Sequence, residues 1–172
     1  MERRVLGKSG IEASNIGLGT YYFGGGDGTS PLSSKDIIDM IHSALDHSIN
    51  LLDTAPAYGF GHCEKIIGKA LEGRRDQAVI ATKCGLWWQD RRGSPNGQKD
   101  GKDQYISLRP DTIRIEVENS LRYLNTDYLD LLQVHKPAIP PEETPIEETM
   151  ACLMELKPVS YTHLTLPTND VV

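Results

Sequence analysis

The chain has 172 residues and a net charge of −6 at neutral pH, with 38% hydrophobic and 24% charged residues. This composition predicts a globular protein with one sizeable core. The negative charge, with basic residues scattered among acidic ones, argues against non-specific binding to nucleic acid or to an anionic membrane surface.

The first part of the chain predicts a hairpin, a strand and a helix. Residues 3–14 alternate around a Gly-Lys-Ser-Gly turn, which is typical of a small β-hairpin. Residues 15–20, NIGLGT, predict a short buried strand. The glycine-rich segment GGGDG at 24–28 lacks the GxGxxG phosphate pattern, and we expect it to form a flexible loop. Ser33 or Ser34 is then suited to cap a helix.

The middle of the chain alternates between apolar strands and amphipathic helices. Residues 49–53 and 78–83 predict two strands, and residues 63–73 predict a helix between them that ends at a glycine. Residues 84–107 are mostly polar and predict a long loop. A proline suits the first turn of a helix over residues 110–124.

Residues 128–135 predict a fourth strand and residues 146–157 a fourth helix. Strands that alternate with helices imply a parallel sheet with right-handed crossovers. Four such pairs make half of a (β/α)8 barrel, which usually has about 250 residues. We therefore expect an α/β fold, namely the N-terminal half of a TIM-type (β/α)8 barrel. It is preceded by a β-hairpin and truncated after about the fourth βα unit, with residues 1–157 as its incomplete domain.

The last segment, residues 158–172, differs in style from what precedes it. It contains three threonines and two prolines and shows no helical period. The stretch SYTHLTLPT resembles a translated sequencing adapter. We therefore expect an irregular tail that is foreign to the preceding sequence.

The cysteines and the apolar pattern bear on the cellular compartment. Cys63, Cys84 and Cys152 form an odd set without CxxC spacing, which argues against a disulfide framework and a zinc site. The N-terminus lacks the apolar segment of a signal peptide, and no apolar run reaches the ~18 residues that span a bilayer. We expect a cytoplasmic protein with no metal site.

Polar residues of complementary chemistry stand where the predicted strands end. Asp53, Lys83 and His135 end three successive strands, and Tyr58 lies on the loop after the first of them. The C-terminal ends of the strands form the active face of such barrels, so these four side chains are expected to converge. An ammonium group favours the ionised form of a nearby phenol, an aspartate can hold the lysine, and an imidazole can hydrogen-bond a carbonyl oxygen. The set predicts proton donation to a carbonyl group as that group is reduced.

Each of these residues also has a purely structural interpretation. Taken singly, an aspartate after a strand caps a turn, a tyrosine is a surface aromatic, a lysine is solvated and a histidine is hydrogen-bonded in the core. Trp87 and Trp88 could wall an apolar substrate pocket or could simply pack against the long loop, and the sequence leaves both interpretations open.

Four segments of the chain are distinctive: GLGTYYFGG (17–25), LLDTAPAYGFGHCEKIIGKAL (51–71), IATK (80–83) and LRYLNTDYLDLLQVH (121–135). They resemble the aldo-keto reductases, a family of NADPH-dependent enzymes built on this barrel, and the resemblance spans roughly residues 3–157. The catalytic aspartate, tyrosine, lysine and histidine of the family match Asp53, Tyr58, Lys83 and His135, in order and with their flanking residues.

The resemblance implies reduction of an aldehyde, ketone or sugar carbonyl to an alcohol, with NADP(H) as the cofactor and Tyr58 as the general acid. It implies that the residues beside the nicotinamide ribose or ring are Gly19, Thr20, Tyr21 and Asp53. The expected substrate-binding residues are Tyr58, Trp87, Trp88 and His135. Lys136 stands where similar bacterial members often have a tryptophan after the catalytic histidine. The resemblance therefore does not define the substrate-binding wall at this position.

A non-catalytic interpretation stays open beside the enzymatic one. The potassium-channel β subunits share this fold and are regulatory proteins, and an intact catalytic set does not exclude such a role. Turnover of an aldehyde with NADPH distinguishes the two. The sequence leaves open the individual carbonyl substrate, the preference between NADPH and NADH, and the oligomeric state.

Overall fold

The computed structural model describes residues 1–24 and 32–165, with side chains up to residue 157. Its main sheet has five strands in the order β10-β9-β5-β4-β3, and every neighbouring pair is parallel. The strands are β3 (Gly17–Gly19), β4 (Leu51–Asp53), β5 (Val79–Cys84), β9 (Leu129–Val134) and β10 (Tyr161–Thr165). The parallel order confirms the predicted α/β fold.

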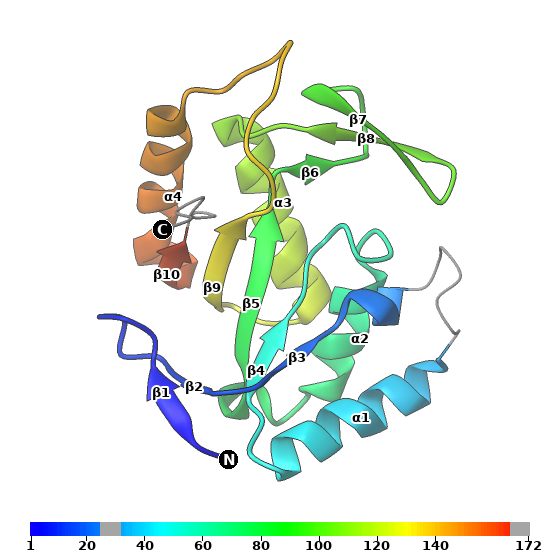
Figure 1. The fold of residues 1–172 in the computed structure, drawn as a ribbon, viewed down its shortest axis with the longest axis vertical. Coiled ribbons are helices and arrows are strands. Elements are labelled where there is room, and N and C mark those ends of the chain that lie inside the picture. Colours follow the sequence, from blue (N-terminus) through cyan, green and yellow to red (C-terminus); the bar gives the residue numbers. More distant parts are fainter. Residues whose placement is uncertain (25–31, 166–172) are drawn as a thin grey trace.

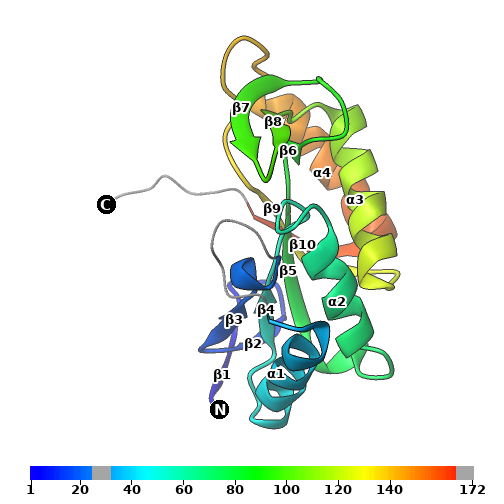
Figure 2. The ribbon, with the colours of Figure 1, turned by 90° about the vertical axis from the view of Figure 1, so that its right-hand side faces the viewer.

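Four helices cover one face of this sheet (Figure 2). They are α1 (Ser34–Asp46), α2 (His62–Ala70), α3 (Pro110–Leu124) and α4 (Ile146–Ser160). Helix α1 begins at a capping box, in which the Ser33 side chain accepts a hydrogen bond from the backbone of Asp36 and the Asp36 side chain bonds back to Ser33. This confirms the predicted cap. Helix α2 ends at Ala70, before the predicted glycine Gly73, which lies in the following turn with a φ of 71°.

Alternation along the strands gives the sheet two apolar faces. Leu52, Ile80 and Leu132 are at most 1% exposed and belong to the core beneath the helices. The opposite face carries a second cluster of Val79, Ala81 and Leu131, with Leu6 and Ile11 packed against it. Both faces therefore contribute to the core, as expected for a parallel sheet.

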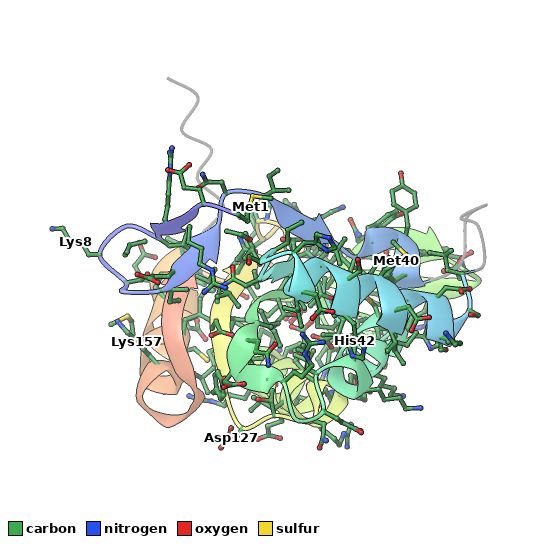
Figure 3. The ribbon with its side chains drawn as sticks, turned by 90° about the horizontal axis from the view of Figure 1, so that it is seen from below. Met1, Lys8, Met40, His42, Asp127 and Lys157 are labelled. Carbon is green, nitrogen blue, oxygen red and sulfur yellow. The ribbon has the colours of Figure 1, made fainter. Side chains whose placement is uncertain are left out.

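Leu6 and Ile11 come from the predicted opening hairpin, whose antiparallel strands are β1 (Arg3–Val5) and β2 (Glu12–Ser14). Seen from below (Figure 3), Met1 and Lys8 of this segment lie on one side of the sheet, and Asp127 lies on the other. The hairpin thus packs against part of the face that the helices leave free. Among the described residues, no helix is both long and apolar enough to cross a membrane.

The predicted long loop over residues 84–107 is wrong. This segment forms a second sheet of three antiparallel strands, β6 (Leu86–Trp87), β8 (Lys102–Ile106) and β7 (Ser94–Lys99), in that spatial order. Strands β7 and β8 are joined by Asp100 and Gly101, which both have positive φ. An Asp-Gly pair with positive φ at both positions is the preferred two-residue hairpin turn, so a turn signal in the sequence was overlooked.

The structure also differs from the expected irregular tail. Helix α4 continues to Ser160, and β10 pairs in parallel with β9, with Tyr161 opposite Leu129 and Thr165 opposite Gln133. Tyrosine and threonine favour strands, and three of the five residues of β10 are of these two types. That residues 158–172 are foreign to the chain stays a prediction. Residues 166–172 and most of the predicted loop at 24–28 lie outside the described residues.

Candidate active site

The register of the parallel sheet brings the predicted residues to one edge. Asp53 at the end of β4 lies opposite Gly19 on one side and Ala81 on the other. Lys83 lies near the end of β5, two residues beyond Ala81. The next strand leads into His135, whose backbone N–H donates to the Cys84 carbonyl at 2.8 Å. Strands β4, β5 and β9 run in the same direction and end at one edge of the sheet (Figure 1). Three separate segments therefore bring a polar residue to one rim.

Lys83 is held firmly at this rim. Its ammonium nitrogen donates to Oδ1 of Asp53 at 2.8 Å and to the carbonyl oxygen of Thr54 at 2.9 Å. The lysine side chain is 14% exposed and the aspartate side chain 45%. A charge-assisted bond to a half-exposed partner fixes the lysine without burying an isolated charge.

The Tyr58 ring occupies the centre of the site. The Lys83 ammonium nitrogen lies 5.2 Å from its ring centroid. Edge-on contacts with the rings of Tyr21 and His135 have centroid separations of 5.2 and 5.9 Å. The structure therefore brings all four predicted catalytic residues, Asp53 included, into one cluster.

A close backbone approach positions Tyr58. Residues Tyr21–Gly24 form a short 3-10 helix that lies directly against the loop after β4. A Cβ atom at Gly59 would lie 2.2 Å from the carbonyl oxygen of Gly24, and Gly59 also has a φ of 65°. A Cβ atom at Gly24 would lie 2.6 Å from the backbone of Tyr58. Only glycine fits at both positions, and sequence analysis did not identify this contact.

His135 is a neutral imidazole at neutral pH. Burial, reinforced by the positive charges of Lys83 and Lys136, lowers the pKa of His135 from 6.5 to about 4. A neutral imidazole can donate one N–H hydrogen bond to a carbonyl oxygen, whereas it is a poor source of a proton.

Comparison with known proteins assigns the family. Residues 15–159 match the model described as "Aldo/keto reductase family". The chain belongs to the aldo/keto reductase family. It is 43% identical over 159 residues to the NADH-specific methylglyoxal reductase of Escherichia coli, covering 91% of this chain and 48% of that protein. It is 45% identical over 162 residues to the aldo-keto reductase YhdN of Bacillus subtilis, covering 91% and 43% of the two chains.

Solved structures agree with the family assignment. The holo form of an aldo-keto reductase from Bacillus halodurans has a TM-score of 0.77 and 32% sequence identity, covering 96% of this chain and 50% of that one. The chain thus spans about half the length of the aldo/keto reductases that it matches.

The residues expected at the cofactor fall into two groups in this aldo/keto reductase chain. Thr20 is fully buried, and both its N–H and its hydroxyl donate to the Asp53 carbonyl at 2.9 Å, so it braces the strand end. The other three border open space, since a Cβ at Gly19 would touch nothing within 4 Å and Tyr21 is 42% exposed. An exposed aromatic ring, a bare strand end and the half-exposed carboxylate of Asp53 fit a ribose and an aromatic base.

The two tryptophans of the family chain have different surroundings. Trp87 is 2% exposed, and its indole N–H donates to Asp90 at 2.8 Å, with the Arg92 guanidinium 4.8 Å from its ring. This is the environment that the packing interpretation expects. Trp88 is half-buried and contacts the Phe60 ring with a centroid separation of 5.3 Å. Neither contact joins the indoles to the Tyr58 cluster.

Two buried glutamates beneath the rim were missed by the sequence analysis. Glu64 of α2 accepts a hydrogen bond from the Thr82 hydroxyl at 2.7 Å, and Glu116 of α3 accepts one from the backbone N–H of Gly85 at 2.7 Å. Burial raises the pKa of Glu64 to about 7 and that of Glu116 well above its ordinary range. Helical spacing places Glu64 on the same face as the core residue Ile67, which is a signal that could have been used.

Proposed function

We propose that this chain carries the proton-transfer residues of an oxidoreductase that reduces an aldehyde or ketone to an alcohol, with NADPH as hydride donor and Tyr58 as general acid. The observation that supports this most directly is the position of the Tyr58 ring between the Lys83 ammonium group and the His135 imidazole. A phenol beside a fixed positive charge and a neutral hydrogen-bond donor suits a carbonyl oxygen that gains negative charge.

Each residue has a distinct role in this proposal. Tyr58 donates its phenolic proton to the carbonyl oxygen. Lys83, held by Asp53 at 2.8 Å, stabilises the negative charge that remains on the phenol. His135, neutral because its pKa is lowered to about 4, donates an N–H to the same oxygen and orients it.

The nicotinamide cofactor supplies the hydride when bound. Gly19, Tyr21 and Asp53 are proposed to contact it, because they border open space beside the Tyr58 cluster. Thr20 is proposed to act indirectly, by holding the Asp53 backbone. The cytoplasm is the proposed compartment, in keeping with three buried cysteines that form no disulfide among the described residues.

The experiment that tests this function is an assay of the whole protein that contains this chain. NADPH and NADH oxidation are followed with an aldehyde and with a ketone, beside equilibrium binding of each nucleotide. We expect turnover, faster with NADPH. Tight nucleotide binding without turnover of any carbonyl compound would instead favour a regulatory role like that of the potassium-channel β subunits.

Residues 1–172 by themselves are proposed to be inactive. In the described sheet β3 and β10 are edge strands, whereas a closed barrel has none. The phosphate site of such barrels is usually formed after the seventh and eighth strands, which lie beyond four βα units. Titration of Trp87 and Trp88 fluorescence with NADPH, beside an aldehyde assay of this polypeptide, checks the proposal. Saturable micromolar binding with turnover would contradict it.

A further inference from the structure

Two residues of strand β7 contact residues that adjoin the catalytic cluster. The ammonium nitrogen of Lys136 donates to Oδ1 of Asn96, near the start of β7, at 3.2 Å. At the other end of the strand, the Lys99 ammonium nitrogen donates to the Tyr21 hydroxyl at 3.2 Å and lies 4.4 Å from the centroid of that ring. Strand β7 therefore makes two contacts beside the rim, one through its own Lys99 and one through Asn96, which accepts from Lys136.

A β-bulge explains how both ends of β7 can face the same way. Side chains three residues apart in a regular strand, such as Asn96 and Lys99, point to opposite faces. The pairing of β7 with β8 shifts register between Pro95 and Gln98, and Gly97 in this interval has a φ of 85°. A bulge inserts an extra residue and turns the following side chains to the other face, and bulges often lie next to active sites.

The two lysines flank the residues that we place at the reacting carbonyl group. Lys99 rests on Tyr21, whose ring packs edge-on against Tyr58 with a centroid separation of 5.2 Å. Lys136 directly follows His135 in the chain. The positive charges of both lysines contribute to the lowered pKa of His135, which indicates that their fields reach the site.

The charges of these lysines are not neutralised by the described part of the chain. The Lys83 ammonium group has Asp53 as its ion-pair partner at 2.8 Å. Within residues 1–24 and 32–157, by contrast, no carboxylate lies within 4.0 Å of the ammonium groups of Lys99 or Lys136. Their hydrogen-bond acceptors are the neutral oxygens of Tyr21 and Asn96. Two cations without a carboxylate partner among the described residues make this side of the rim attractive to anions.

We propose that Lys99 and Lys136 form a subsite for an anionic group, a carboxylate or a phosphate, on the carbonyl substrate. The inference rests on the proposed function, because it assumes that a carbonyl compound binds at Tyr58 and His135. In this arrangement the phenol and the neutral imidazole hydrogen-bond to the carbonyl oxygen, and the two ammonium groups bind the negatively charged end of the substrate. The favoured substrate is an aldehyde or ketone that also carries a carboxylate or a phosphate group.

The test compares matched substrates with the whole protein. The values of kcat and KM are measured for 4-carboxybenzaldehyde against benzaldehyde and for succinic semialdehyde against butanal. We expect the anionic member of each pair to have the higher kcat/KM, with the difference reduced by added salt. Lys136→Met and Lys99→Met should each lower kcat/KM for the anionic member about tenfold, mainly through KM, and leave the neutral member within about twofold. Lys99→Arg, which keeps the charge, should retain the preference.

Lys65→Met is the matched control. Lys65 also rests on a tyrosine ring, 4.7 Å from the centroid of Tyr123, but on helix α2 and outside the cluster. Its loss should leave both members of each pair unchanged. Equal effects of Lys136→Met on anionic and neutral substrates, or no preference in the unmodified protein, would overturn the proposal.

Two further measurements separate other sources of the anion. If the lysines bind a phosphate of the cofactor, Lys99→Met and Lys136→Met will weaken NADPH binding and affect all substrates alike, which contradicts a substrate subsite. If the protein turns over no carbonyl compound at all, the proposed function fails. Calorimetric binding of 4-(hydroxymethyl)benzoate against benzyl alcohol then decides whether the anionic subsite exists on its own.

Discussion

Two sets of carboxyl groups lie near the end of strand β5, and they differ in exposure and in the charge of their partners. Asp53 is 45% exposed at the side chain and pairs with the Lys83 ammonium group at 2.8 Å. Glu64 and Glu116 are 0% and 3% exposed and accept hydrogen bonds from the neutral donors Thr82 and Gly85. All three contact residues 82–85, at the end of β5 and just after it, yet only Asp53 has a cation as its partner.

The difference follows from the cost of burying charge. An ionised carboxylate without a cation is expensive away from water, so Glu64 and Glu116 keep their protons to higher pH. Asp53 is half-exposed to water and bonds to an ammonium group, so its charge pair at the rim has a small desolvation cost. Fixed charge therefore lies at the exposed rim, whereas the buried side of β5 is contacted by carboxyl groups whose pKa values are raised.

The largest expected effect is at the centre of the rim. Tyr58→Phe in the whole protein removes the proposed proton donor and should lower kcat by about 100-fold or more while nucleotide binding stays nearly unchanged. Tyr22→Phe is the control, because Tyr22 is 66% exposed and, among the described rings, its one ring contact is with Tyr21. Retention of most aldehyde reduction by Tyr58→Phe would remove this residue from the role of general acid.

Glu64→Gln tests the buried half of the comparison through stability. The folded protein holds the Glu64 proton up to a pKa of about 7, whereas the unfolded chain releases it near 4.5. The raised pKa makes Glu64 destabilise the fold progressively as pH rises through this window, and fully above it. In the glutamine variant the free energy of unfolding has no pH dependence from residue 64. Its stability relative to the unmodified protein should therefore rise by about 2–3 kcal/mol between pH 5 and pH 8. Urea unfolding at the two pH values measures the difference, and parallel curves would contradict it.

Asp53→Asn makes the same chemical change, carboxyl to amide, at the rim. The Lys83 ammonium group would keep the Thr54 carbonyl at 2.9 Å but lose its charged partner. We expect kcat for aldehyde reduction to fall about tenfold, because the lysine beside Tyr58 loses its charged partner. A loss of kcat in Asp53→Asn without a loss of kcat in Glu64→Gln would sharpen the comparison. Equal losses of kcat in the two variants would break it.

The smallest expected effect concerns His135. Its folded pKa of about 4 lies below the ordinary 6.5, so its neutral form contributes stability above pH 6.5 that is lost as pH falls to about 4. Lys136→Met removes one of the charges that lower this pKa and should raise it by less than about one unit, because burial is the larger cause. An NMR titration of the His135 ring measures the shift. A ring that titrates near 6.5 before any substitution would contradict the neutral imidazole assigned to the site.

Much of this architecture follows from the sequence alone. Alternation between apolar strands and amphipathic helices predicts a parallel sheet, and a parallel sheet requires its strands to end at one edge. The positions of Asp53, Lys83 and His135 at the rim follow from that rule, and the motifs around them indicate the family. Local sequence patterns were sufficient to place these residues, because the residues around each strand end predict where that strand ends.

Contacts between distant segments were decided only by the tertiary structure. The Asp100-Gly101 turn was a visible signal for the second sheet, but its bulge and its approach to Tyr21, 78 residues away from Lys99, were not. The fit of Gly24 against Gly59 and the burial of Glu64 beneath Thr82 likewise join separate segments. Propensity and periodicity report on neighbours along the chain, whereas steric fit, burial and the fields of remote charges depend on packing between elements. The sequence therefore determined which residues reach the rim, and the packing decided the charge, the support and the neighbours that they have there.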